Sequence, residues 1–432
     1  MIWNPRYECM DREEMRNLQL DRLKETLDRA YQRVPFYRNL FDSRGVKPSD
    51  LEKLEDISKF PFTVKNDLRD NYPYGLFAVP LEKVVRLHAS SGTTGKPIVV
   101  GYTSQDLDTW AECVARFATQ AGVTSKDVAQ VTFGYGLFTG AFGLHYGLER
   151  VGAAVVPASS GNSEKHIMLM QDFGTTVLVG TPSYCLHLAE VAVEMGVDPT
   201  QLPVRLGLFG AEAWSEKMRE EIERAWGIKA TDNYGLSEVM GPGPSGECEY
   251  TCGMHISEDF FLFEVVDPQT GQPLDYGQEG EIVITTLTKE AMPLIRYRTR
   301  DISVLNPAKC DCGRTTTRMR KVTGRTDDML IISGVNIFPS QIESVLMGIE
   351  GIAPHYQIIV GKKGYLDYIE VQVEIAQEKF TGQFRYLEEL EEKVRRRLNS
   401  VLSISARVKL LEPKSLERST GKAKRVIDNR NK

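Results

Sequence analysis

Short apolar segments alternate with amphipathic helical segments between residues 84 and 240, and this alternation limits the fold more than any other feature of the chain. The apolar segments, at 151–156, 176–179 and 205–209, have the length and composition of buried strands. The helical patterns lie at 104–121, 163–173, 183–196 and 215–226. Strands that alternate with helices in this way form a sheet covered by helices, so the sequence predicts an α/β fold.

The segments outside this region predict further elements and a second domain. Residues 12–41 carry an apolar stripe at helical spacing, and residues 260–304 are typical of a small antiparallel β unit. Beyond a boundary expected near 325–328, the patterns predict helices at 339–348 and 382–400 and strands at 355–361, 368–374 and 406–411. We therefore expect a large N-terminal domain at 1–326 and a small α+β C-terminal domain at 327–432.

A loop rich in hydroxyl groups lies between two β-rich segments and reads Ser90-Ser91-Gly92-Thr93-Thr94-Gly95-Lys96. Backbone N–H groups, hydroxyls and a lysine in such a loop can bind phosphate oxygens. A Walker P-loop would need Gly at position 90 and Ser or Thr at position 97, where this chain has Ser90 and Pro97. The flanks predict a strand on each side, so we interpret the loop as a phosphate-binding hairpin. A flexible surface hairpin is the alternative.

Composition and charge argue against several classes of function. The net charge of −6 gives no general surface for nucleic acid or an anionic membrane, although residues 401–432 are basic and resemble a solvated tail or a phosphate-facing surface. The N-terminus lacks an apolar signal core, so we expect a cytoplasmic protein. Residues 128–148 carry no charged side chain but hold five glycines, which suits an irregular cavity wall better than a membrane helix.

Four of the seven cysteines gather in two short segments together with a histidine. An odd number of cysteines without a secretion signal argues against a disulfide framework. Cys248, Cys252, His255, Cys310 and Cys312 are five candidates for a tetrahedral metal site. A chance grouping of free thiols is the alternative. A zinc-bearing nucleic-acid-binding module would also need a basic face beside the cluster, and the net charge argues against it.

Five further motifs follow the hydroxyl-rich loop in a fixed order. They are Gly210-Ala211-Glu212, Asp232-Asn233-Tyr234-Gly235-Leu236-Ser237-Glu238, the charged run Arg296–Asp301, Gly324–Asp328, and Ser419–Arg425. Each alone has a structural explanation, such as a core tyrosine or a turn aspartate. Together, over about residues 84–425, they closely resemble the adenylate-forming superfamily of acyl-CoA synthetases, carrier-domain adenylation enzymes and luciferases. Segments 133–139, 287–301 and 333–339 are most similar to its phenylacetate–CoA ligase branch.

The resemblance implies a reaction in two halves. A carboxylate attacks the α-phosphate of ATP to give an acyl-adenylate and pyrophosphate, and the thiol of coenzyme A then displaces AMP. Because the first step brings two anions together, charge neutralisation is its main physical need. We expect an aryl acetic acid, foremost phenylacetate, as the substrate, with transfer to a carrier-protein thiol as the alternative. We expect no nucleic-acid or membrane partner, and the resemblance implies a homodimer and a mobile C-terminal domain.

The resemblance also implies roles for individual residues in ATP binding. The β- and γ-phosphates would be held by Ser90, Ser91, Gly92, Thr93, Thr94 and Lys96. The adenine pocket would be lined by Gly210, Ala211, Glu212, Asp232 and Asn233, and Gly235 is a further residue expected to bind the nucleotide. Tyr234 would lie against the adenine ring, Asp301 would accept both ribose hydroxyls, and Glu238 would bind Mg²⁺.

The remaining roles concern catalysis, the acid and the metal. Lys422 would bridge the substrate carboxylate and the α-phosphate, with Glu238 and Arg325 as further catalytic residues and Asp327 as the hinge. The acyl pocket is expected from Phe133, Tyr135, Gly136, Phe138 and Phe142. By similarity to some relatives with a Glu-Cys-x₆-His pattern, Cys248, His255, Cys310 and Cys312 would hold a structural zinc ion, with Cys252 left over.

Overall fold

The computed structural model of the chain describes residues 1–90, 97–137, 139–332, 335–363, 366–380, 384–402, 404–418 and 423–430. The chain forms two compact units, each assembled from separate stretches. Unit 1 comprises residues 1–180, 201–211 and 229–322. Unit 2 comprises residues 181–200, 212–228 and 323–432.

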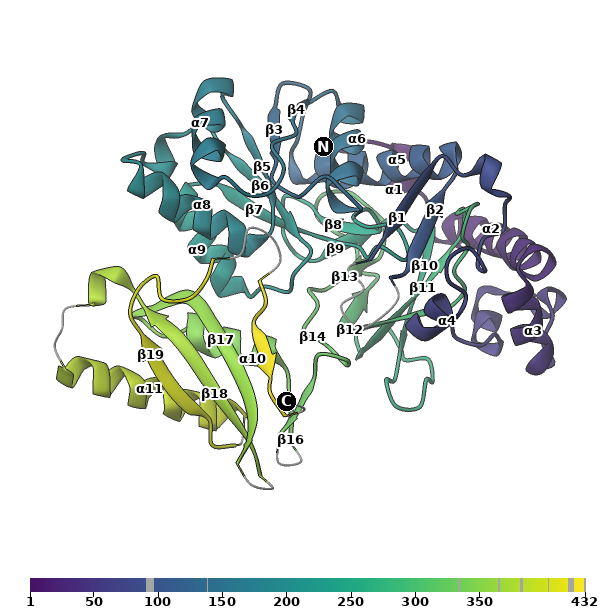
Figure 1. Ribbon diagram of the computed structural model, residues 1–432. Helices are drawn as coiled ribbons and strands as arrows, with labels where there is room; N and C mark the ends of the chain where they lie inside the picture. Colours follow the sequence, from purple (N-terminus) through teal and green to yellow (C-terminus); the bar gives the residue numbers. More distant parts are fainter. Residues whose placement is uncertain are drawn as a thin grey trace. The chain divides into compact units, whose positions relative to one another are not determined.

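Five parallel strands form one half of the main sheet of unit 1. In spatial order they are β7 (Lys229–Tyr234), β6 (Leu206–Gly210), β5 (Val177–Gly180), β3 (Val128–Val131) and β4 (Ala154–Val156). Figure 1 shows β3, β5, β6 and β7 side by side. Strands β5 and β6 are buried along their whole length, which explains why they read as short, purely apolar segments.

The same sheet continues beyond β7 as an antiparallel half. These strands are β8 (Ser245–Glu247), β9 (Met254–Ile256), β13 (Arg318–Met319), β12 (Tyr297–Asn306), β11 (Glu279–Thr286) and β10 (Phe261–Val266). The antiparallel character expected for residues 260–304 is therefore present, but those strands extend the large sheet instead of standing apart from it.

Helices of unit 1 surround this sheet. They are α1 (Pro5–Glu8), α2 (Arg12–Arg33), α3 (Pro35–Ser43), α4 (Lys65–Asp70), α5 (Ser104–Ala121), α6 (Gly140–Val151) and α7 (Ser163–Phe173), with the 3₁₀ turns η1 (Pro48–Asp50), η2 (Leu54–Lys59) and η3 (Leu81–Lys83). The helix expected at 12–41 is two helices, because Val34 is extended and Pro35 begins the second. The strand expected from residue 151 begins only at Ala154, since α6 reaches Val151 and Gly152 ends it with φ 90°.

A two-stranded sheet flanks the hydroxyl-rich loop. Strands β1 (Arg86–Ala89) and β2 (Val99–Tyr102) pair antiparallel, as the strand-loop-strand prediction requires. The residues between them, 91–96, lie outside the described residues. At the start of the loop, the Ser90 backbone N–H donates to the Ile98 carbonyl over 2.9 Å, and the Ile98 N–H donates to the Ser90 hydroxyl over 3.1 Å.

The uncharged, glycine-rich segment 128–148 forms strand β3, a loop and most of helix α6. Its glycines let α6 approach α5 closely: a Cβ atom on Gly147 would lie 2.2 Å from the Cβ of Val114, and one on Gly143 would lie 2.5 Å from the Trp110 ring. In the part of the chain that the structure describes, the helices are all too short or too polar to span a bilayer.

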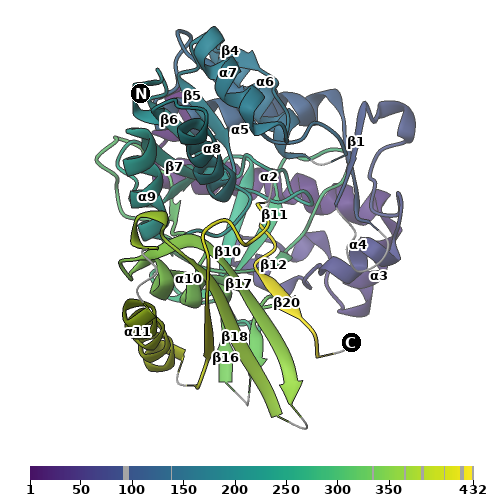
Figure 2. The same cartoon turned by 60° about the vertical axis from the view of Figure 1, so that its left-hand side comes forward.

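Unit 2 contains a second, four-stranded sheet. The helices of unit 2 are α8 (Pro182–Glu194), α9 (Glu216–Trp226), α10 (Pro339–Met347) and α11 (Phe384–Leu402), with the 3₁₀ turn η5 (Gln377–Lys379). Its strands are β14 (Gly324–Arg325), β15 (Leu330–Ile332), β16 (Val335–Ile337), β17 (Ile352–Lys363), β18 (Leu366–Ile375), β19 (Arg407–Leu411) and β20 (Val426–Asp428). The 3₁₀ turn η4 (Pro199–Gln201) lies where the chain passes back to unit 1. The strand order is β19-β18-β17-β20, and Figure 2 shows α11 alongside this sheet.

Helices and strands of unit 2 could be predicted from the sequence because their buried apolar residues recur at regular spacing. Ile342 and Leu346 of α10, Val394 and Leu398 of α11, and Ile358 of β17 are fully buried in one cluster. The expected α/β class with a smaller α+β part is confirmed. Interpreting the C-terminal residues as a solvated tail was wrong for Val426–Asp428, which pair parallel with β17 as strand β20.

Candidate functional site

The carboxyl ends of β6 and β7 are held in a fixed arrangement. The Asn233 side-chain amide donates to the Phe209 carbonyl over 2.6 Å, and a Cβ on Gly210 would lie 2.5 Å from the Asn233 carbonyl oxygen. Only glycine therefore fits at position 210. The Asp232 N–H donates to the buried Glu247 carboxylate over 2.8 Å. Ligands of open α/β sheets bind outside such strand ends.

Tyr234 and Asp301, far apart in the sequence, meet at this edge of the sheet. The Tyr234 hydroxyl, at the end of β7, donates to Oδ2 of Asp301 in β12 over 2.6 Å. Asp301 is buried, while the Tyr234 ring is half-buried. The phenol thus fixes the orientation of the carboxylate to which the resemblance assigns the ribose hydroxyls.

The arginines that precede Asp301 make ion pairs that are largely shielded from water. Arg296 forms two hydrogen bonds to Glu264, of 2.9 and 3.2 Å, and also donates to the Phe60 carbonyl. Arg298 pairs with Glu281, whose carboxylate also accepts the Arg300 N–H over 3.2 Å. Burial raises the pKa of Glu264, and the Arg296 charge opposes that rise. The charged run therefore anchors strand β12 and sets the position of Asp301.

Glu238 is buried at the end of the motif that begins with Asp232. Its carboxylate lies 3.8 Å from the ammonium of Lys65, at the start of α4. The neighbouring Ser237 hydroxyl lies 3.2 Å from the Thr139 hydroxyl, just before α6. A buried carboxylate that faces a half-exposed lysine is a suitable oxygen ligand for a hard cation such as Mg²⁺.

The expected acyl pocket is represented by a cluster of aromatic rings. The rings of Tyr135 and Phe142 meet edge to face, with centroids 5.3 Å apart. The Tyr135 hydroxyl lies 3.0 Å from Nδ1 of His145, and the Arg86 guanidinium lies over the Phe142 ring. Burial raises the pKa of the Tyr135 phenol above its usual range. Phe133 and Gly136 lie on the same loop as Tyr135, and Phe138 lies outside the described residues.

In unit 2, Glu212 links two backbone segments. Its Oε1 accepts the Ser183 N–H at the start of α8 over 2.7 Å, and its Oε2 accepts the Ala423 N–H over 3.2 Å. Burial raises the pKa of Glu212, and the hydrogen bond from Ser183 opposes the rise. Glu212 therefore contacts the residue that directly follows Lys422, which itself lies outside the described residues. Ala211, which precedes Glu212 in unit 1, is exposed with φ 69°.

Arg325 and the expected hinge residue Asp327 contact each other directly. Their side chains form two hydrogen bonds of 2.9 and 3.1 Å, and Asp328 lies 3.5 Å from the same guanidinium. Asp327 is exposed.

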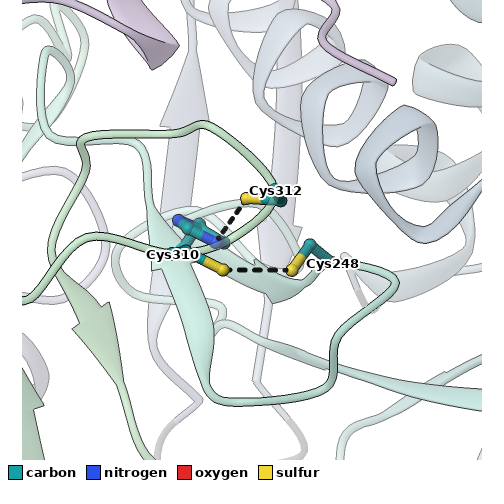
Figure 3. Close-up of side chains that lie close together, drawn as sticks. Cys248, Cys310 and Cys312 are labelled. Atoms are coloured by element: carbon teal, nitrogen blue, oxygen red, sulfur yellow. Dashed lines mark hydrogen bonds between the residues drawn. The ribbon is translucent and has the colours of Figure 1, made fainter.

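The four residues expected to bind zinc come together in unit 1. The donor atoms of Cys248, His255, Cys310 and Cys312 all lie within 4.8 Å of one another. Figure 3 shows the three thiols with the interactions Cys248–Cys310, 3.8 Å, and Cys312–His255, 3.3 Å. In a tetrahedral zinc site with Zn–S bonds of about 2.3 Å, two sulfur ligands lie about 3.8 Å apart.

Neighbouring side chains orient this cluster. Nδ1 of His255 lies 2.9 Å from the Thr316 hydroxyl, which leaves Nε2 directed at Cys312, as in zinc sites whose histidines are held by a second hydrogen bond. Cys252 is exposed, and its sulfur lies 3.5 Å from the sulfur of Cys310. The Arg318 guanidinium donates to the Cys252 sulfur over 2.6 Å. Cys252 is therefore close to the cluster but engaged by an arginine.

Sequence reasoning missed three charged residues near these positions. Lys65 faces Glu238, Glu281 holds the arginines of β12, and the buried Lys289 donates to backbone carbonyls of the Glu238 turn. Lys289 lies within the segment 287–301 that carries part of the resemblance, yet its partners cannot be inferred from the neighbouring residues. Such roles depend on which strands are neighbours, and no local pattern reports that.

Comparisons with known proteins bear on the whole chain. The family model described as "AMP-binding enzyme" matches residues 49–288, and the model described as "AMP-binding enzyme C-terminal domain" matches residues 334–430. The phenylacetate-coenzyme A ligase of Aromatoleum evansii is 51% identical over 98% of this chain and 97% of the relative. The enzyme of the same name from Escherichia coli strain K12 is 51% identical over 97% of this chain and 96% of its own.

Solved structures are similar over the same extent. The crystal structure of 2-hydroxyisobutyryl-CoA ligase in the postadenylation state, in complex with 2-HIB-AMP, superposes with a TM-score of 0.94. That chain is 30% identical, and the match covers 99% of this chain and 92% of the ligase.

Replacing Glu281 tests the account of strand β12. Glu281→Leu leaves the half-buried Arg298 guanidinium without its fully buried carboxylate partner. Removing one partner of a buried pair costs about 3–5 kcal/mol, and this half-buried pair should lie at or below the lower end of that range. The thermal midpoint should fall markedly, whereas Glu279→Ala, an exposed position on the same strand, should leave it nearly unchanged. The double variant Glu281→Leu/Arg298→Met should recover part of the loss. An unchanged midpoint in Glu281→Leu would contradict the anchoring role.

Proposed function

Because the chain belongs to the AMP-binding enzyme family, we propose that it activates phenylacetate or a close aryl acetic acid with ATP and transfers the acyl group to coenzyme A. The observation that carries this proposal is the 51% identity to a phenylacetate-coenzyme A ligase over 98% of the chain. The resemblance to the adenylate-forming superfamily, first drawn from the motifs, is confirmed by the family models and by relatives that span nearly the whole chain.

The geometry of unit 1 supports a nucleotide site at the carboxyl edge of the sheet. Asp301 would accept the ribose hydroxyls in an orientation that the Tyr234 hydroxyl fixes, and the ring of Tyr234 would face the adenine. Asn233 and Gly210 hold the floor of that site rigid. A rigid nucleotide site supports adenylation because the α-phosphate must stay in line with the attacking carboxylate oxygen.

Glu238 is the residue we propose to hold Mg²⁺. Its buried carboxylate provides the oxygen ligand that Mg²⁺ prefers, and Lys65 lies 3.8 Å away. When bound, the ion would neutralise phosphate charge and so ease the departure of pyrophosphate. Lys65 would then be close enough to contribute a second positive charge to the same phosphates.

The aromatic cluster supports an aryl acid as the substrate. Tyr135 and Phe142 provide flat apolar surfaces, which suit a phenyl ring. Arg86 lies over Phe142 and Tyr146, so it stacks on the cluster and contacts two of its rings. A ring pocket of this kind favours an aryl acid over a long flexible chain.

Coenzyme A is the acceptor that the curated relatives support, since four of them carry the name phenylacetate-coenzyme A ligase. Transfer to a carrier-protein thiol is not favoured. We further propose a homodimer, on the basis of the resemblance alone, and a cytoplasmic location. The cytoplasmic location is supported by the cysteines: all seven lie within the described residues, and none of them forms a disulfide.

An assay of AMP formation tests the proposed activity. With ATP, Mg²⁺ and coenzyme A, AMP should form when phenylacetate is added, more slowly with benzoate or indoleacetate, and not without an acid. Replacing coenzyme A with a phosphopantetheinyl carrier protein should abolish thioester formation. The absence of acid-dependent AMP would overturn the proposal, and thioester on the carrier alone would favour the alternative acceptor.

Lys422 should matter in one half-reaction only. Lys422→Ala removes the charge that would bridge the carboxylate and the α-phosphate, so acid-dependent ATP–pyrophosphate exchange should be lost. Thioester formation from supplied phenylacetyl-adenylate should largely survive. Lys424→Ala, an exposed lysine two positions later, is the matched control and should retain both activities. Equal loss of both half-reactions in Lys422→Ala would contradict the assignment.

We propose that Cys248, His255, Cys310 and Cys312 hold one structural zinc ion. Their donor atoms converge, and Thr316 orients the histidine. Four protein ligands make a closed site, so the ion would stabilise the fold without taking part in the chemistry. Next to Cys312, the buried Arg314 bonds Glu8 over 2.6 Å, so the cluster would also fix the N-terminal segment to the sheet.

Metal analysis of purified variants tests this site. The unaltered protein should contain about one zinc per chain, and Cys248→Ser or Cys312→Ser should lose it together with thermal stability. Cys9→Ser, whose sulfur lies 3.6 Å from the Gly313 carbonyl but outside the ligand set, should keep the metal. Cys252→Ser should also keep it. Zinc retained in Cys248→Ser but lost in Cys252→Ser would show that the ligand set is wrong.

A further inference from the structure

Lys289 is a buried lysine that donates to two backbone carbonyls next to the proposed magnesium ligand. Its side chain is 2% exposed. Its ammonium donates to the carbonyl oxygens of Val239, over 2.8 Å, and Glu238, over 3.1 Å. It also lies 4.8 Å from the centroid of the Tyr102 ring. Burying a cation is costly, so a lysine in such a place needs compensating partners.

The segment that carries Lys289 is itself held from α5. Both oxygens of the buried Asp106 accept backbone N–H groups, from Glu290 over 2.7 Å and from Ala291 over 3.0 Å. Thr103, the residue before α5, donates its hydroxyl to Glu290 over 2.8 Å. Asp106 and Glu238 are the acidic groups that act on Lys289. Burial nevertheless lowers the pKa of Lys289 to about 8, against the opposing pull of those carboxylates.

The turn that Lys289 contacts is short and non-helical. The N–H groups of Val239 and Met240 both donate to the Leu236 carbonyl, which closes the turn after Ser237 and Glu238. The carbonyls of Glu238 and Val239 point instead at the Lys289 ammonium. The Glu238 carbonyl belongs to the residue that carries the carboxylate, so a shift of this peptide changes the backbone of Glu238 and with it the direction of its side chain. The Val239 carbonyl fixes the next peptide of the same turn. Mg²⁺ demands near-ideal octahedral geometry, so small rotations of its protein ligand matter.

We propose that Lys289 is a positioning residue for adenylation: it fixes the backbone of the Glu238 turn and thereby aims the Glu238 carboxylate at the magnesium ion. This inference rests on the proposed function and on the role proposed there for Glu238. In this role Lys289 acts through the backbone of the Glu238 turn and not on the substrate. Its effect should therefore be confined to the half-reaction that uses the metal.

The test compares Lys289→Met with Gln19→Leu. Gln19 is also buried and also donates to two backbone carbonyls, those of Glu258 and Phe261, elsewhere in unit 1. For Lys289→Met, the Mg²⁺ concentration that half-saturates phenylacetate-dependent ATP–pyrophosphate exchange should rise about 10- to 100-fold, the usual effect of losing an outer-shell partner. Thioester formation from supplied phenylacetyl-adenylate should stay within about 3-fold of the unaltered enzyme. Gln19→Leu should lose thermal stability with an unchanged Mg²⁺ requirement.

Two additional variants keep the outcome interpretable. Lys289→Gln retains a donor and should shift the Mg²⁺ requirement less than Lys289→Met, which covers the case in which Lys289→Met does not fold. Glu238→Gln should shift it at least as much as Lys289→Met. Equal loss of both half-reactions in Lys289→Gln, or an unchanged Mg²⁺ requirement, would overturn the positioning role. No exchange in the unaltered enzyme would instead refute the proposed function, and an unaffected Glu238→Gln would refute the metal ligand.

Discussion

The antiparallel pairing of β8 with β7 determines where the site of unit 1 lies. Up to β7 the strands are parallel, and their carboxyl ends share one edge of the sheet. At β8 the direction reverses, and the following strands bring β12 back into the same sheet. Only through this order does Asp301 of β12 reach Tyr234 at the end of β7.

Two ion pairs hold strand β12 in this sheet, and removing their charges from water costs free energy. In the pairs Glu264–Arg296 and Glu281–Arg298, one partner is buried and the other is half-buried, so both pairs are largely removed from water. Replacing both partners of such a pair by apolar side chains is often neutral or stabilising for the fold. We therefore attribute to these pairs a role in setting the pairing register of the strands, not a net gain in stability. Arg298 of β12 pairs with Glu281 of the neighbouring β11, and Arg296, just before β12, pairs with Glu264 of β10. The register of β12 therefore follows from its charges as much as from its apolar residues.

Local signals account for what could be predicted from the sequence. Helix α5 matches its predicted bounds because Thr103 and Asp106 form a capping box and Gly122 ends the helix in the left-handed region. Helix α7 likewise lies between Asn162 and Gly174. Strand β20 and the continuity of the main sheet were missed, because both depend on pairing between distant segments. The motif residues were found by resemblance. The roles of Lys65, Glu281 and Lys289 depend on side chains and carbonyls far away in the sequence, so they could be assigned only from the structure.

The four residues of the cysteine cluster come from the same antiparallel part of the sheet. Cys248 directly follows β8, His255 lies in β9, and Cys310 and Cys312 follow β12. In sheet order β8, β9, β13 and β12 are consecutive, so a metal bound to these residues would span the antiparallel half next to β7. Tyr234 lies on β7, next to one end of that span, and Asp301 lies on β12 at its other end. A closed metal site here would therefore act on the chemistry only through the spacing of these two residues. A role in catalysis would require an open coordination position, and four converging protein ligands leave none.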